Sequence, residues 1–130
     1  MNADLHDPLK TGHDKIDTQH QELYHLVAML DRALTQNTHH EIEAIIVFLE
    51  HYVEDHFLEE ETFMLSKQYQ GYPHHKEDHD IFKARVFSLR HDFNSGVPDI
   101  RLFFAIRMFI DKLIYHIKTI DVGIAKLVEK

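Results

Sequence analysis

Residues 41–64 read EIEAIIVFLEHYVEDHFLEEETFM, a run that contains neither glycine nor proline. Its apolar residues recur at steps of three and four, which is the spacing of one face of an α-helix. They are Ile42, Ile45, Ile46, Leu49, Tyr52, Val53, Phe57 and Met64. Thr38-x-x-Glu41 offers a capping box at the start, and Gln70-Gly71-Tyr72-Pro73 breaks the pattern after it. The run therefore predicts a long amphipathic helix.

Three more helices are predicted by the same spacing on either side of this run. The first has a capping box at Thr18-x-x-Gln21, so it should begin near Asp17 or Thr18 and end at residues 35–37. The third should follow Pro73 and end at the turn formed by residues 94–98, and the fourth should begin near Asp99. Their apolar stripes are Leu23, Leu26, Val27, Leu30 and Leu34; Phe82, Val86, Leu89 and Phe93; and Leu102, Phe103, Ile106, Ile110 and Leu113.

Short loops between long amphipathic helices favour an antiparallel, up-down-up-down four-helix bundle. The fold class is therefore predicted to be all-α, with one domain over residues 1–130, a length typical of a single domain. Residues 1–16 are polar and aperiodic, and we expect them to form an N-terminal arm.

Composition excludes several classes of protein. The chain has no cysteine, which excludes disulfides, iron–sulfur clusters and thiolate zinc sites. Its net charge of -8, from 22 acidic and 14 basic residues, argues against nucleic acid as a partner. No apolar run is long enough to span a membrane and no signal peptide is visible, so we expect a cytoplasmic location with no membrane partner.

The thirteen histidines are the unusual feature of the composition, and five of them lie at the ends of apolar stripes. His56 and Glu60 are four residues apart, as are His75 and His79, so each pair shares one helix face. His20 precedes the first stripe and His116 follows the last. In an antiparallel bundle, the start of the first helix, the end of the second, the start of the third and the end of the fourth meet at one level.

A single histidine on an apolar stripe is more often a hydrogen-bonded core residue than a metal ligand. Five of them at one level with a carboxylate are different, because each buried polar group without a partner costs about 1–3 kcal/mol and a charged one costs more. A metal ion removes these costs together. Imidazole and carboxylate ligands suit iron, zinc, copper or manganese. Five histidines exceed one ordinary site, so we predict two ions, bridged by Glu60 and Asp121.

Asp121 is the weakest member of this set when spacing alone is considered. It stands five residues after His116, which on a regular helix places it on a different face. The two side chains can converge only if the helix ends there or is underwound, as in a π-bulge. The spacing by itself therefore favours a surface aspartate.

Four segments together resemble the hemerythrin family, called bacteriohemerythrins in prokaryotes. They are Ile16-Asp-Thr-Gln-His20, Tyr52-Val-Glu-Asp-His56-Phe-Leu-Glu-Glu60-Glu, His75-Lys-Glu-Asp-His79 and His116-Ile-Lys-Thr-Ile-Asp121. The resemblance runs from about residue 9 to residue 121. It implies a non-haem di-iron centre with Glu60, Asp121 and a solvent-derived oxo or hydroxo group as bridges. One iron would be held by His75, His79 and His116, and the other by His20 and His56.

This ligand count leaves the iron held by His20 and His56 with one open position. The resemblance implies that dioxygen binds there reversibly, in a carrier, a store or a sensor, and that small anions bind when the irons are oxidised. The resemblance is also compatible with a signalling output domain or partner. Register and family position together nominate four residues for an apolar oxygen pocket: Leu23, Phe57, Leu113 and Ile117. Lys112 stands where family members often carry tryptophan; if it lines the pocket, autoxidation rate and anion affinity should differ.

Two other classes of function compete with oxygen binding. One is enzymatic: iron repair, or peroxide and nitric oxide chemistry, at the same di-iron site. A hydrolase reading of the pairs His79-Asp80 and His91-Asp92 is weaker, because His79 already belongs to the HxxxH motif. The other is a helical interaction module that binds zinc adventitiously. The remaining histidines, and Glu59 and Glu61 beside Glu60, are expected to be exposed.

Overall fold

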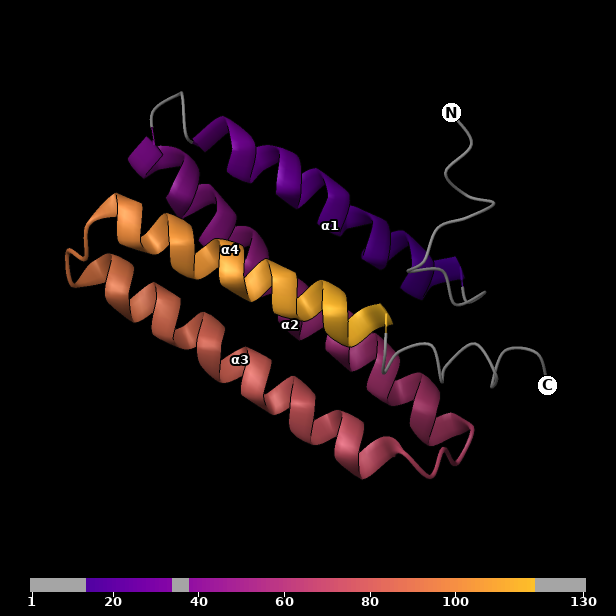
Figure 1. Ribbon diagram of the computed structural model, residues 1–130. Helices are drawn as coiled ribbons and strands as arrows, with labels where there is room; N and C mark the ends of the chain where they lie inside the picture. Colours follow the sequence, from indigo (N-terminus) through magenta and orange to yellow (C-terminus); the bar gives the residue numbers. More distant parts are fainter. Residues whose placement is uncertain (1–13, 34–37, 119–130) are drawn as a thin grey trace.

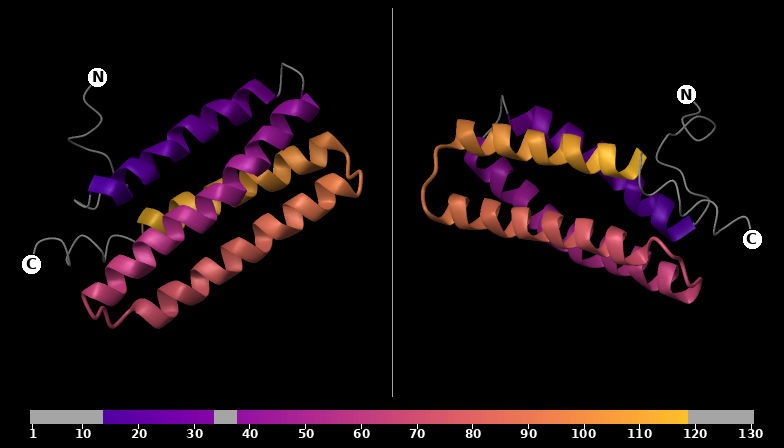
Figure 2. Two further views of the ribbon diagram at one scale, coloured as in Figure 1. Left: turned by 180° about the vertical axis from the view of Figure 1, so that it is seen from behind. Right: turned by 60° about the horizontal axis from the view of Figure 1, so that its bottom comes forward.

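The computed structural model describes residues 14–33 and 38–118, and these form four helices. They are α1 (Asp14–Ala33), α2 (Thr38–Ser66), α3 (Tyr72–Asn94) and α4 (Asp99–His116). Successive helices run in opposite directions, so that the start of α1, the end of α2, the start of α3 and the end of α4 lie toward one end of the bundle (Figures 1 and 2). The predicted all-α antiparallel bundle is confirmed.

The four helices surround one apolar core. α2 packs against all three of the other helices, and α1 also contacts α4, which closes the bundle. The predicted stripe residues of α2 are buried, including Leu49 and Val53, which lead toward His56. The stripes of α3 and α4 are buried in the same core, although Phe93 is only partly buried. Burying apolar area of this extent is the main favourable term in folding.

α1 begins at Asp14, three residues before the earlier of the two starts predicted from its capping box. Ile16 is fully buried and packs in a small cluster with Met64, near the partly buried Phe63 and Tyr69. Burial of Ile16 against the end of α2 stabilises an additional turn that the local capping signal did not show. Residues 14–16 therefore belong to α1, and residues 1–13 of the predicted arm lie outside the described part of the chain, as does Leu34.

The other helix ends agree with the signals read from the sequence. α2 starts at Thr38, α4 starts at Asp99, and Pro73 lies in the first turn of α3. α3 ends in a Schellman motif, in which Gly96 adopts a φ of 85° and the N–H of Val97 donates to the carbonyl of Asp92 at 3.1 Å. Only a residue that tolerates positive φ fits this turn well, which is why glycine stands there.

No helix in residues 14–33 or 38–118 is both long enough and apolar enough to cross a membrane.

One polar link between helices makes a testable contribution to stability. The Arg90 guanidinium donates to both carboxylate oxygens of Glu50, at 2.9 and 3.1 Å, and so joins α3 to α2. The hydrogen bond from Arg90 lowers the pKa of Glu50. Because the folded-state pKa is depressed, the contribution is present above the unfolded-state pKa and is lost as pH falls through the folded-state value.

We expect Glu50→Gln to lower the free energy of unfolding of the metal-free protein by about 0.5–1 kcal/mol at neutral pH, since the pair is partly exposed and screened by solvent. The difference from the wild type should shrink as pH falls through the pKa of Glu50. Urea unfolding across this pH range measures it, with Glu54→Gln, at an exposed position of the same helix, as the control. A difference that does not change with pH would contradict the assignment.

Candidate metal centre

Helix α2 places two of the predicted ligands in the interior of the bundle, toward one of its ends. His56 and Glu60 are one turn apart on α2, and their exposed fractions are 1% and 0%. They follow Leu49 and Val53 on the core-facing stripe, so folding of an amphipathic helix is enough to carry them inward. A carboxylate this deeply buried requires positively charged or hydrogen-bonding partners.

Four imidazoles surround that carboxylate. The Nε2 atoms of His20 and His56 each lie 3.1 Å from Oε2 of Glu60. On the other oxygen, Oε1, the Nε2 atoms of His79 and His75 lie at 3.0 and 3.5 Å. Histidines from α1, α2 and α3 therefore converge on one carboxylate, as the antiparallel topology predicted.

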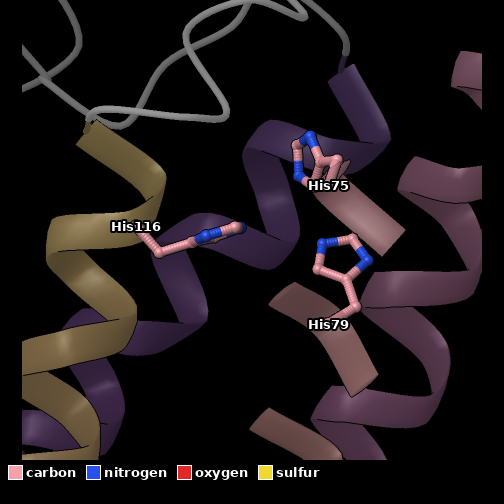
Figure 3. A group of neighbouring side chains, drawn as sticks. All are labelled: His75, His79 and His116. Atoms are coloured by element: carbon pink, nitrogen blue, oxygen red, sulfur yellow. The ribbon is translucent and has the colours of Figure 1, made fainter. Parts of the chain in front are cut away.

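The ligand-capable atoms divide into two groups, each with its members within 4.8 Å of one another. The three-histidine group consists of His75, His79 and His116, and the two-histidine group consists of His20, His56 and Glu60. Figure 3 shows the rings of the three-histidine group turned toward one space, with His116 reaching from α4 toward the pair on α3. The ring centroids of His75 and His116 are 5.1 Å apart, and all three residues are buried.

The contacts of His79 indicate that a cation belongs between the two groups. Its Nδ1 lies 2.8 Å from the carboxylate of Glu61 in a buried hydrogen bond, so this nitrogen carries the proton and donates it. In the neutral ring, Nε2 is then a bare lone pair, yet it faces Oε1 of Glu60 at 3.0 Å without forming a hydrogen bond within the described residues. Two acceptors held face to face repel each other unless a proton or a metal ion lies between them. The donor set of imidazoles and a carboxylate fits iron.

The electrostatics of Glu60 agree with this arrangement. Burial alone would raise the pKa of Glu60, but the imidazoles that face its oxygens, those of His56, His20 and His75, hold that pKa well below its usual range. Glu60 is therefore an ionised carboxylate, the form that binds a metal ion.

The prediction that Glu61 is exposed is wrong. The exposed fraction of Glu61 is 7%, and its carboxylate binds His79. A signal was available in the sequence: Glu61 follows Phe57 by one turn, just as Glu60 follows His56. Glu59, beside it, is half-buried.

The remaining histidines behave largely as expected. His25, His40, His51, His74 and His91 are exposed, and His6 and His13 lie outside the described residues. His39 is exposed as well, but its Nδ1 lies 2.9 Å from Asp99 at the opposite end of the bundle, where it ties the start of α2 to the start of α4.

Asp121 lies outside the described residues, so its position as a ligand stays a prediction. The backbone leading to it is informative, however. After His116 the chain is π-helical at Ile117 and Lys118, the last two described residues. An underwound turn at this point is the condition under which residues five apart can converge on one face.

The four residues nominated for an oxygen pocket all lie in the apolar core. Leu23, Phe57, Leu113 and Ile117 have exposed fractions of 0–1%, and Phe57 stacks flat on the His79 ring with centroids 3.9 Å apart.

Lys112 is exposed and lines an outer groove of about 330 Å³ between α3 and α4, whose lining also includes His116 and Tyr115. Lys112 thus faces this groove from the surface rather than from the buried core.

The family of the chain follows from its similarity to known proteins. The family model described as Hemerythrin HHE cation binding domain matches residues 11–128, which is nearly the whole chain. The chain belongs to the hemerythrin family. All six described members of the predicted ligand set lie within the matched hemerythrin region.

Relatives carrying the hemerythrin name come from several organisms. The chain is 36% identical to a bacteriohemerythrin of Pseudomonas paraeruginosa over 90 residues, which is 69% of this chain and 59% of that protein. It is 35% identical to a hemerythrin polypeptide of Sipunculus nudus over 107 residues, 82% of this chain and 77% of the relative. A myohemerythrin of Riftia pachyptila is 28% identical over 115 residues, covering 88% and 84%. The comparison with solved structures gave no match.

Proposed function

We propose that this chain binds dioxygen reversibly at a non-haem di-iron centre, as a carrier, a store or a sensor module. The observation that carries the proposal is the meeting of two ligand groups at one ionised carboxylate, Glu60, inside a hemerythrin-type bundle. In this proposal His75, His79 and His116 would hold one iron, and His20 and His56 would hold the other. Glu60, Asp121 and an oxo or hydroxo group would be shared by the two.

The unequal ligand groups explain why such a centre would bind a small molecule. Three imidazoles would be available to one ion and two to the other. The ion held by His20 and His56 would therefore keep one coordination position for dioxygen, or for a small anion when the centre is oxidised. Bound iron supplies the electrons for reversible oxygen binding, and the protein's part is to fix the ligands and to control what reaches them.

The surrounding apolar residues support binding rather than oxidation of a substrate. Leu23, Leu113 and Ile117 are fully or almost fully buried. Leu23 lies three residues after His20, and Leu113 and Ile117 lie on either side of His116 in the sequence. Buried apolar side chains next to the ligands would limit the entry of water and anions and so slow loss of electrons to the medium. Neutral imidazoles also stabilise highly oxidised iron less than carboxylates do, and ferritin-like di-iron proteins use four carboxylates. The donor set here is richer in imidazole.

The direct test is reversible oxygenation. The purified protein would be reduced under anaerobic conditions, exposed to air and then deoxygenated again, with metal analysis and visible spectra at each stage. We expect two irons per chain and a charge-transfer band that appears with air and disappears on deoxygenation. Zinc without iron would refute the proposal, and irreversible bleaching with turnover of peroxide or nitric oxide would favour the enzymatic alternative.

The location and partners of the protein remain predictions. The cytoplasm was inferred from the sequence, and a signalling output domain or partner fits a sensor role. The chain matches only 59% of the length of the Pseudomonas relative. The activity and partners of the whole protein are therefore part of this proposal.

A further inference from the structure

Two interleaved pairs of side chains leave α2 near its C-terminal end. His56 and Glu60 form the pair that enters the candidate metal centre. One residue further along, Phe57 and Glu61 form a second pair with the same spacing, and both contact His79 of α3. The same turn of helix thus supplies ligands to the centre and a support for a ligand on the neighbouring helix.

The second pair restricts both the tilt of the His79 ring and its rotation by 180°. Phe57 lies parallel to it, with an interplanar angle of 1° and centroids 3.9 Å apart, which holds the plane of the ring. The Glu61 carboxylate, 2.8 Å from Nδ1, stops the ring from turning over and holds its proton on that nitrogen. Nε2 is thereby kept as the lone pair that faces the centre, 3.0 Å from Glu60.

The contact of Glu61 with His79 is stronger than the contact of Asp78 with His116, another histidine of the three-histidine group. Asp78 lies 3.7 Å from Nδ1 of His116, which is too long for a hydrogen bond, and Asp78 is only partly buried. Glu61 is buried and within hydrogen-bonding distance. Charge-assisted hydrogen bonds of this kind are about twice as strong as neutral ones, and a carboxylate on the far nitrogen makes a ligating imidazole more basic.

From these contacts we propose that Glu61 is a positioning residue for the iron held by the three-histidine group. It acts through His79, whose tautomer and orientation it sets, and it raises the affinity of that group for metal relative to the two-histidine group. The inference rests on the proposed function, because it takes both groups to bind iron. It assigns a role to a residue that is not itself a ligand.

The test compares Glu61→Gln and Glu61→Ala with the wild type. Glu54→Gln is the matched control, since it removes the same charge from an exposed position of the same helix. Anaerobic titration of the metal-free protein with Fe²⁺ alone should show that Glu61→Gln weakens one of the two binding steps by about 10- to 100-fold. The other step should stay as in the wild type, and Glu54→Gln should change neither step.

Nuclear magnetic resonance of the Zn²⁺-loaded protein gives a readout that a purely space-filling role would not move. The resonance of the His79 Nδ1 proton should be strongly deshielded in the wild type and less so in Glu61→Gln. In Glu61→Ala this resonance should be lost, because the proton exchanges with water. Circular dichroism checks that each variant is folded. Two unchanged binding steps in a folded Glu61→Gln, or an unchanged Nδ1 proton, would overturn the inference. Failure of the proposed function would look different, because the wild type itself would then bind fewer than two Fe²⁺ ions, and the inference would fall with it.

Discussion

Replacing Glu60 with glutamine is expected to abolish tight binding of both iron ions while leaving a folded bundle. The carboxylate lies within 3.0–3.5 Å of four imidazoles, and the two ligand groups meet there. Glutamine keeps the shape of the side chain but removes the negative charge that offsets the charge of the cations. Loss of a support behind one ligand already weakens binding by about 10- to 100-fold, so loss of a shared ligand should cost more for each ion.

The measurement is iron content per chain after expression in iron-replete medium, together with the far-ultraviolet circular dichroism of each protein. Glu54→Gln, which removes one charge from an exposed position of α2, should keep its iron. If folded Glu60→Gln retained both irons at the wild-type level, Glu60 would not be the bridge between them.

Removal of the metal is expected to lower the thermal stability substantially. Without it, the five buried imidazoles of the two ligand groups and the Glu60 carboxylate lose their shared cations. A ligand that is present at about 100 times its dissociation constant stabilises the folded state by about 2.7 kcal/mol. For a domain of this length, that corresponds to a melting temperature lower by roughly 10 °C in the metal-free protein.

Differential scanning calorimetry of the iron-loaded and chelator-treated protein measures the difference. Glu60→Gln should melt at the same temperature with and without the chelator, because it has no metal to lose. Equal melting temperatures for loaded and stripped wild type would show that the candidate centre does not couple metal binding to folding.

The sequence was most informative where apolar residues kept the helical spacing over several turns. The stripe of α2 and the i, i+4 pairs His56/Glu60 and His75/His79 predicted both the bundle and the level at which its ligands meet. This worked because helical geometry fixes the direction of every side chain once the apolar face is known. The pattern therefore nominates the five histidines and Glu60, and the structure brings their side chains together.

Contacts between helices were harder to predict from the sequence. The spacing from Phe57 to Glu61 indicates that Glu61 shares a face with a core residue, but only the packing of α2 on α3 brings its carboxylate to His79. The early start of α1 had the same cause, since Ile16 gains its burial from Met64 on a different helix. In both cases the contact partner lies far away in the chain, so a local pattern can indicate burial but not the partner.

Asp121 illustrates a different limit. Its assignment came from the hemerythrin resemblance, because a regular helix would turn it away from His116. Residues 117–118 are π-helical, and underwinding of this kind is the condition that the assignment requires, although a sequence pattern alone does not predict it.

Anomalous diffraction at the iron absorption edge tests most directly whether this bundle holds two irons at defined positions. We expect two anomalous peaks in crystals of the iron-loaded protein. One should lie among the Nε2 atoms of His75, His79 and His116, and the other beside His20 and His56, with Glu60 between them. A single peak, or iron peaks away from these residues, would contradict the account.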